Sequence, residues 1–183
     1  MTSTRSRTTI REPRLGVDIG RVIIDGGSHP HGGDTAFFSG DEATVLATPE
    51  VPGAVATIAR LVPLFGGRVW LVSKCGEEVE ARTRRWLEAH DFFGRTGIDP
   101  DHLRFCRRRP QKRDHAEELR LTHFVDDRAD VHAALEGVVT HRYFFGPQPG
   151  PVPEGGRHTP TWTDVGRLIE ASLAVASTDT GRG

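Results

Sequence analysis

The sequence predicts a three-layer α/β fold in which a parallel sheet of five or more strands lies between helices. Short, continuous apolar runs are typical of strands buried on both faces, and here they alternate with longer amphipathic segments. Clusters of Gly, Pro, Asp and Ser separate many of these segments. The 183 residues suit one domain, and a composition of 36% hydrophobic residues can still form a core.

The strands are expected at five apolar runs in the sequence, namely 15–18, 68–73, 102–106, 121–126 and 138–145. The helices are expected between or after these runs, at 52–65, 77–91, 111–120, 129–136 and 163–176. Because each helix separates two strands or follows the last one, the order favours a Rossmann-like topology with helices on both faces.

Local signals support two of these helices in particular. Pro52 lies near the first turn of the first helix, and Gly66 and Gly67 end it. The second helix has acidic residues in its first turn, where they interact favourably with the helix dipole. Residues 25–49 and 146–160 are expected to be loops because they are rich in Gly, Pro and polar residues.

A single domain is expected over residues 15–176, with tails at 1–14 and 177–183. No apolar run approaches the roughly 20 residues that cross a bilayer, and the basic start of the chain does not look like a secretory signal. We therefore expect a cytoplasmic protein that does not bind membranes. Its two cysteines, Cys75 and Cys106, are too few for a disulfide framework and are expected to be reduced thiols.

Polar residues end three of the predicted strands, and a lysine begins the helix that precedes the fourth strand. These are Asp18, Ser73, the pair Asp126 and Asp127, and Lys112. Because sites form at the carboxyl ends of parallel strands, we expect these side chains to converge at one edge of the sheet. Several carboxylates together need a cation to offset their repulsion, and oxygen ligands in an open site suit Mg²⁺.

These residues occur in a familiar order. The segment Asp18-Ile19-Gly20-Arg21-Val22 follows an apolar strand, WLVS ends in Ser73, Lys112 comes next, and HFVDD ends in Asp126 and Asp127. Over about residues 15–145 the chain thereby resembles the haloacid dehalogenase-like superfamily of phosphohydrolases and phosphotransferases. The resemblance implies a Rossmann-like domain, and the short segments between the motifs imply a member with a minimal cap or none.

The resemblance also implies a role for each motif. Asp18 would attack phosphorus and form an aspartyl-phosphate, Ser73 would donate to a phosphoryl oxygen, and Lys112 would neutralise negative charge. Arg21 and Lys74 are expected beside the substrate. Mg²⁺ would be held by Asp18, the Gly20 carbonyl and one acid of the last motif. Asp127 is the choice for this ligand and Asp126 for a supporting role, with the opposite assignment open.

The sequence departs from the family pattern at Gly20, which stands where the family has a second aspartate as general acid and base. Loss of a general acid or base typically costs about 10²–10⁴ in rate. Three explanations are open. Asp25, His29 or His31 could supply the proton, the leaving group could need no acid, or the protein could retain the scaffold as a weak catalyst or a non-catalyst.

The leading hypothesis is Mg²⁺-dependent hydrolysis of a phosphate monoester, either a small molecule or a bulky phosphoester admitted by an open site. One alternative is a binding or regulatory protein that uses the same site without turnover. A second is a phosphatase that processes nucleic-acid ends, suggested by the arginines in 104–109, although a net charge of −1 gives no general attraction to nucleic acid. A homo-oligomer in which a partner subunit closes the site is also open.

Purely structural roles are also open for the same residues. Ser73 could cap the helix that follows it, Lys112 could be a solvated helix residue, and Asp126 and Asp127 could cap the helix at 129–136. The arginine run could be a solvated basic edge, and the nine histidines show no metal-binding spacing.

Overall fold

Six strands form one all-parallel sheet in the computed structural model, which describes residues 12–26, 37–38, 40–148 and 150–179. The strands are β1 (Leu15–Val17), β2 (Val69–Lys74), β3 (Leu103–Cys106), β4 (His123–Asp126), β5 (His141–Phe145) and β6 (Gly156–Thr159). The fold is therefore α/β and Rossmann-like, as the alternation of apolar runs predicts.

The order of the strands across the sheet is β3-β2-β1-β4-β5-β6. The chain runs outward from β1 to β3, returns to the middle of the sheet, and then runs outward again from β4 to β6. The direction of winding thus reverses between β1 and β4. In open parallel sheets the crevice at the carboxyl ends of such a strand pair is where ligands bind.

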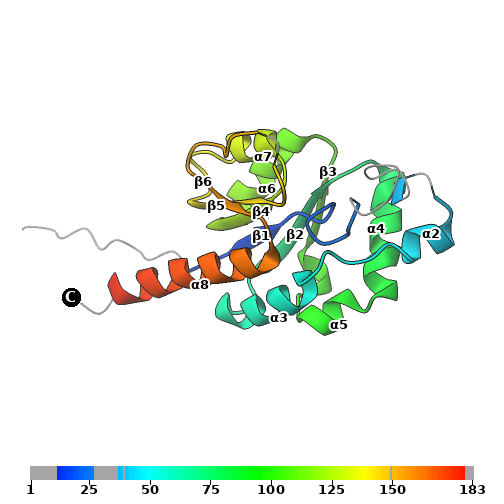
Figure 1. The fold of residues 1–183 in the computed structure, drawn as a ribbon, viewed down its shortest axis with the longest axis horizontal. Coiled ribbons are helices and arrows are strands. Elements are labelled where there is room, and N and C mark those ends of the chain that lie inside the picture. The colour runs from blue at the N-terminus through cyan, green and yellow to red at the C-terminus, as the bar shows by residue number, and fades with distance from the viewer. Residues whose placement is uncertain (1–11, 27–36, 39, 149, 180–183) are drawn as a thin grey trace, which may run out of the picture.

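Helices cover both faces of the sheet (Figure 1). They are α2 (Glu42–Leu46), α3 (Ala54–Leu64), α4 (Glu77–Ala89), α5 (Phe92–Thr96), α6 (Lys112–Glu118), α7 (Ala129–Ala134) and α8 (Trp162–Asp179), with short 3₁₀ turns η1 (Pro100–His102) and η2 (Arg109–Gln111). Residues of α3, α4, α5 and α8 share one hydrophobic cluster with the sheet. Residues of α6 and α7 belong to a second cluster on the opposite face.

The alternation of side chains along β2 illustrates why both faces are apolar. Val69 and Leu71 point into the first cluster, whereas Trp70 and Val72 point into the second. A strand with a core on each side needs apolar residues at every position, which explains the continuous run that marks it in the sequence. At the centre of β1, Gly16 leaves room for the Phe124 ring, which a Cβ atom would approach to 2.6 Å.

All five predicted strands are present, but the prediction of an unbroken loop at 146–160 is wrong. The strand β6 lies within that segment and pairs with β5 in parallel. Its sequence, Gly-Arg-His-Thr, buries only Thr159, so this edge strand carries no apolar pattern that sequence analysis could detect. Backbone hydrogen bonds to β5, and not hydrophobic periodicity, define it.

The loop prediction at 25–49 is also incomplete, because the short helix α2 lies within it. The Asp41 carboxylate caps this helix by accepting a hydrogen bond from the Thr44 amide at 2.8 Å. Residues 27–36 and 39 lie outside the described part of the chain. At the carboxyl end, α8 continues to Asp179, three residues past the predicted limit. None of the helices in the described ranges is long and apolar enough to span a bilayer.

Candidate active site

Three aspartates meet where the winding of the sheet reverses. Asp18 follows β1 directly, Asp126 ends β4, and Asp127 comes one residue later. The Asp18 amide donates to the Val125 carbonyl at 2.9 Å, which continues the β1–β4 pairing to the edge of the sheet. Carboxylate oxygens of the three aspartates lie within 4.8 Å of one another. Residues more than 100 positions apart in the sequence are thus brought together, as expected for polar residues at the ends of neighbouring parallel strands.

Lys112 lies between two of these carboxylates. Its Nζ is 2.7 Å from Asp18 Oδ1 and 2.7 Å from Asp126 Oδ2, and its side chain is only 2% exposed. The alternative role as a solvated helix residue is therefore wrong. Its ammonium also lies 5.9 Å from the centre of the Phe124 ring, which contributes a weak cation–π attraction.

Burial and charge act in opposite directions on these groups. Burial by itself would lower the pKa of Lys112, but the negative charges of Asp126 and Asp18 outweigh it, so this pKa is raised and the ammonium stays charged. Burial raises the pKa of Asp126 above its ordinary value, against the influence of Lys112. Burial, followed by the charge of Asp18, raises the pKa of Asp127 to about 6. The cluster therefore has three carboxylates and only one buried ammonium, that of Lys112, to offset their repulsion.

The two acids of the last motif differ in how fully they are hydrogen-bonded. Both oxygens of Asp126 are occupied, because Oδ1 accepts from the Arg128 amide at 2.9 Å and Oδ2 accepts from Lys112. Asp127 Oδ2 forms an ion pair with Arg21 Nη2 at 2.9 Å. Within the described part of the chain, no donor reaches the other oxygen of Asp127 or the second oxygen of Asp18.

These observations allow a test of whether a divalent cation fits. One oxygen of each aspartate lies within 4.8 Å of an oxygen of the other two, so the three carboxylates form a group that could hold a metal ion. Burial and, after it, the charge of Asp18 raise the pKa of Asp127, and a bound cation would relieve the repulsion between these two carboxylates. The donor set is all oxygen and partly open to solvent, which suits a hard divalent cation, and Asp126 already accepts a hydrogen bond from Lys112.

A cavity of about 240 Å³ lies over the cluster. Every residue that the sequence analysis places in the site lines this cavity, except Asp126, which is buried beneath it. Its lining includes Asp18, Gly20, Arg21, Ser73, Lys74, Lys112 and Asp127. Ser73 belongs to β2 and is 8% exposed. Its alternative role as a helix cap is wrong, because Gly76 is the N-cap of α4 and no side chain caps that helix.

Gly20 is exposed, and a Cβ atom added there would have no neighbour within 4 Å. Among the described residues, nothing fills the position of the missing aspartate. Of the substitutes considered, Asp25 lines a neighbouring cavity and is not among the residues that line the smaller one. His29 and His31 lie outside the described residues. Arg21, the next residue, adopts a left-handed conformation with φ of 60°, which turns the chain back after Gly20.

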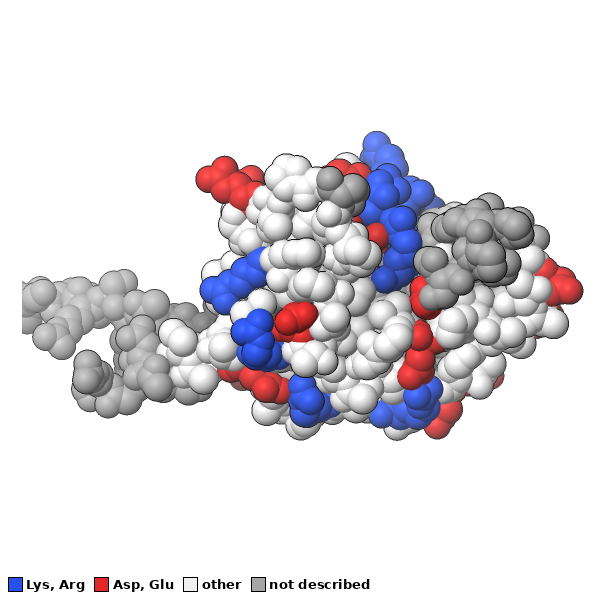
Figure 2. Space-filling model, in the orientation of Figure 1, with Lys and Arg blue, Asp and Glu red and all other residues white. Residues whose placement is uncertain are grey.

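Four further residues line the small cavity and have no assigned role in the sequence analysis: Phe38, Arg109, Arg128 and Val131. Arg109 belongs to the arginine run at 104–109, and Arg128 follows the two aspartates directly. Two arginines of the run form ion pairs, because Arg109 lies 3.6 Å from Asp130 and Arg107 lies 3.0 Å from Glu80. Figure 2 shows a group of Lys and Arg side chains on the upper part of the face in view.

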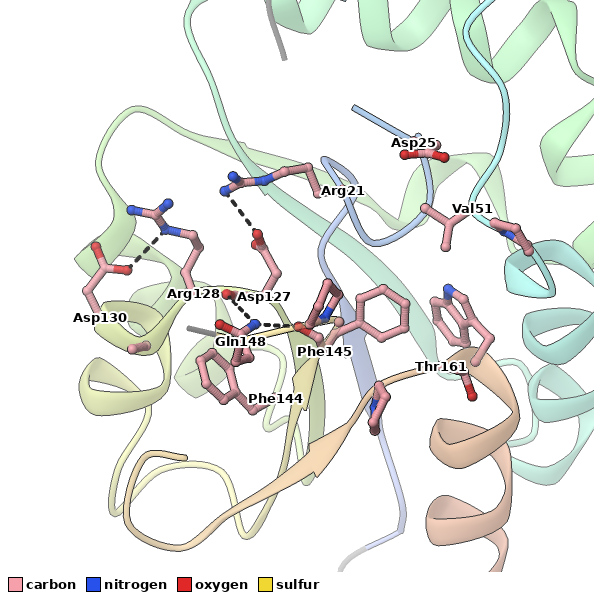
Figure 3. Close-up of a pocket in the computed structure, with 16 residues that line it drawn as sticks. Arg21, Asp25, Val51, Asp127, Arg128, Asp130, Phe144, Phe145, Gln148 and Thr161 are labelled. Atoms are coloured by element: carbon pink, nitrogen blue, oxygen red, sulfur yellow. Dashed lines mark hydrogen bonds and ion pairs between the residues drawn. The ribbon is translucent and has the colours of Figure 1, made fainter. Parts of the chain in front are cut away.

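A second, larger cavity adjoins the first (Figure 3). Its volume is about 940 Å³, and it shares Arg21, Asp127 and Arg128 with the smaller one. Sequence analysis gave no sign of it, because its walls come from five separate segments of the chain. A scan against protein-family models and a search of curated proteins found no match to this chain.

Proposed function

We propose that this protein is a haloacid dehalogenase-like phosphohydrolase that hydrolyses a phosphate monoester with Mg²⁺, through Asp18 as nucleophile. The observation that carries the proposal is the contact of Lys112 Nζ with Asp18 and Asp126 at 2.7 Å, beside Asp127 and beneath a cavity of about 240 Å³, which is large enough for a phosphoryl group. The buried ammonium of Lys112 holds the Asp18 carboxylate in a fixed orientation, which an attacking carboxylate requires.

The first step is attack of an Asp18 oxygen on phosphorus, with cleavage of the bond to the ester oxygen. The leaving group departs with the electron pair of that bond and takes its proton from water, because Gly20 offers no acid. Water then attacks the phosphorus of the aspartyl-phosphate, which releases inorganic phosphate and restores the Asp18 carboxylate. A good leaving group suits this route, because it departs without protonation.

The other side chains stabilise charge on the phosphoryl group. Ser73 donates a hydroxyl hydrogen bond, and Lys112 and Lys74 offset the negative charge of the phosphoryl oxygens. Arg21 and Arg128 line both this cavity and the larger one beside it. Mg²⁺, when bound by Asp18, Asp127 and the Gly20 carbonyl, supplies further positive charge against the phosphoryl oxygens. Two buried, free cysteines fit a cytoplasmic setting.

The decisive experiment measures hydrolysis of p-nitrophenyl phosphate with Mg²⁺ by the wild type and by Asp18→Asn. We expect the substitution to reduce kcat/KM at least about 10³-fold, because an amide cannot act as the nucleophile. Asp114→Asn, an exposed aspartate in the first turn of α6, is the matched control and should leave the rate unchanged. Activity that survives Asp18→Asn would disprove the covalent mechanism.

Gly20 also supports a second candidate, a binding or regulatory protein that holds a phosphorylated ligand without turnover. The variant Gly20→Asp separates the two, because the open space there admits a carboxylate without displacing neighbours. If the protein is an enzyme, the variant should hydrolyse an alkyl phosphate about 10²-fold faster than the wild type, which must itself show activity. Activity found only in Gly20→Asp would identify the wild type as the binding protein.

A further inference from the structure

The larger cavity has two chemically different sides (Figure 3). Arg21, Asp127, Arg128 and Asp130 lie on the side that adjoins the Asp18 site. The remainder of the wall is mainly apolar and consists of Val51, Pro52, Phe144, Phe145, Pro147, Pro160 and Trp162. It also carries Gln148, Thr161 and the carboxylate of Asp25, which lies beside Val51 in Figure 3. A ligand that begins at the Asp18 site and extends into this cavity would pass from charged to apolar surroundings.

The charges on the polar side are already balanced within the protein. Arg21 pairs with Asp127 at 2.9 Å, and Arg128 Nε lies 3.6 Å from Asp130 Oδ1. Asp25 adds another carboxylate to the wall. The cavity therefore has no excess of positive charge for a second phosphate group, and it favours an occupant that is uncharged apart from the reacting phosphate.

Internal hydrogen bonds fix the walls in place. Gln148 Nε2 donates to the Asp127 carbonyl at 3.1 Å and to the Phe145 carbonyl, which ties the loop after β5 to the loop after β4. Trp162 Nε1 donates to the Val22 carbonyl at 2.7 Å, which joins α8 to the turn after Asp18. A cavity with such connections needs little rearrangement to accept a ligand.

We propose that this cavity binds the leaving group of the phosphoester, and that the group is an uncharged, ring-bearing one such as an aryl or heteroaryl alcohol. The inference rests on the proposed function for its orientation, with phosphorus at Asp18. A volume of about 940 Å³ is within the range of small-molecule sites, and apolar walls with a few polar groups are typical of them. Such alcohols are also good leaving groups, which matches the lack of an acid at Gly20.

The test measures binding with two phosphonates that an esterase cannot hydrolyse, 1-naphthylmethylphosphonate and methylphosphonate. Both place the same anion at the Asp18 site, but only the first carries a ring system. Isothermal titration with Mg²⁺ should show the naphthyl compound binding at least tenfold more tightly, because its ring buries apolar surface against the cavity wall. Equal affinities would overturn the inference.

Two variants locate the difference. Ala129→Trp places a bulky ring at a residue that lines the cavity, and Ala133→Trp places the same ring on an exposed position of the same helix outside it. The first should abolish the tenfold preference, and the second should preserve it. Pro52→Trp, on another part of the wall, is a second filling variant should Ala129→Trp fold poorly. A preference that survives both filling variants would place the ring elsewhere and overturn the inference.

Turnover measured beside binding separates this inference from the proposed function. If neither p-nitrophenyl phosphate nor an alkyl phosphate is hydrolysed, but the naphthyl preference is present and sensitive to Ala129→Trp, the cavity assignment stands and the enzymatic proposal fails. If turnover is present but the naphthyl preference is absent, the enzymatic proposal stands and the cavity assignment fails. Tighter binding of a 5′-phosphorylated oligonucleotide that weakens with salt and ignores Ala129→Trp would replace the ring-bearing group with nucleic acid.

Discussion

The strand β4 has a buried ionisable residue at each end, and the two residues have opposite electrostatic surroundings. His123 begins the strand and is 3% exposed, whereas Asp126 ends it and is fully buried. Burial, followed by the nearby His141, lowers the pKa of His123 to about 3, so its ring is neutral at pH 7. Asp126 instead contacts the charged ammonium of Lys112.

The hydrogen-bond partners of His123 are uncharged hydroxyl groups. Its Nδ1 lies 2.7 Å from the Thr122 hydroxyl and its Nε2 lies 3.0 Å from the Ser172 hydroxyl. Its ring stacks on His141, with ring centres 4.4 Å apart. These hydrogen bonds satisfy both ring nitrogens, so this end of the strand is a structural part of the core.

The comparison shows that a buried ionisable residue by itself does not indicate a site. The amino end of β4 is neutral and closed, whereas its carboxyl end holds charges of both signs under a cavity. Keeping charges buried costs free energy that a neutral network avoids, and proteins maintain such an arrangement where the charges act on a ligand. Three predictions test this difference.

The largest effect is expected at the charged end. Lys112→Met removes the ammonium and leaves the Asp126 carboxylate buried without its partner, which should lower the free energy of unfolding by about 3–5 kcal/mol. Urea denaturation followed by circular dichroism measures it. Lys74→Met, at the exposed end of β2, is the matched control and should change stability by less than about 0.5 kcal/mol. A loss below about 1 kcal/mol for Lys112→Met would contradict the assignment of a buried charged cluster.

The second effect concerns the neutral end and appears as a dependence on pH. The folded pKa of His123 is about 3, well below the value of about 6.5 in the unfolded chain, so acid protonates the unfolded chain first. The stabilisation is complete above pH 6.5 and is lost as the pH falls toward 3. Between pH 7 and pH 4 the wild type should lose about 3 kcal/mol more than His123→Gln, whose amide does not titrate.

This comparison of pH profiles removes contributions that both proteins share, including those of the carboxylate cluster. His158→Gln alters an exposed histidine and should keep the profile of the wild type. Parallel profiles for the wild type and His123→Gln would show that the buried imidazole is not held neutral.

The smallest effect is expected from Mg²⁺ and should be confined to the charged end. At ten times its dissociation constant the ion should stabilise the wild type by about 1.4 kcal/mol, which raises Tm by about 3–6 °C for a chain of this length. Asp127→Asn should lose this shift, because a neutral amide is a poor ligand, whereas His123→Gln should keep it. Thermal scans with and without Mg²⁺ measure both. An equal shift in Asp127→Asn would place the ion elsewhere.

Much of the fold was predictable because the central strands are buried on both faces. Continuous apolar runs marked β2 and β4, and Gly66 and Gly67, both with positive φ, ended α3 as predicted. The prediction failed where the periphery of the sheet is exposed. The strand β6 is polar and forms only because β5 presents a free edge, and α2 is a five-residue helix held by a single cap. Short polar elements carry little local signal.

For the candidate site, the sequence named the members and the structure supplied their contacts. Asp18, Ser73, Lys112, Asp126 and Asp127 were all identified from polar residues at strand ends and from the order of the motifs. The sequence could not predict that Arg21 pairs with Asp127. Nor could it predict that both oxygens of Asp126 accept hydrogen bonds, one from Lys112 and one from the Arg128 amide. These contacts depend on side-chain directions across the crevice.

The sequence by itself determined the alternation of strands and helices, and with it the edge of the sheet at which the polar residues gather. Hydrophobic periodicity is local, so it can be detected along the chain. Only the tertiary structure decided which aspartates retain an oxygen without a described donor, and that a large, mainly apolar cavity lies beside the cluster. Those properties arise where segments far apart in the chain pack together, and no pattern within any one segment encodes them.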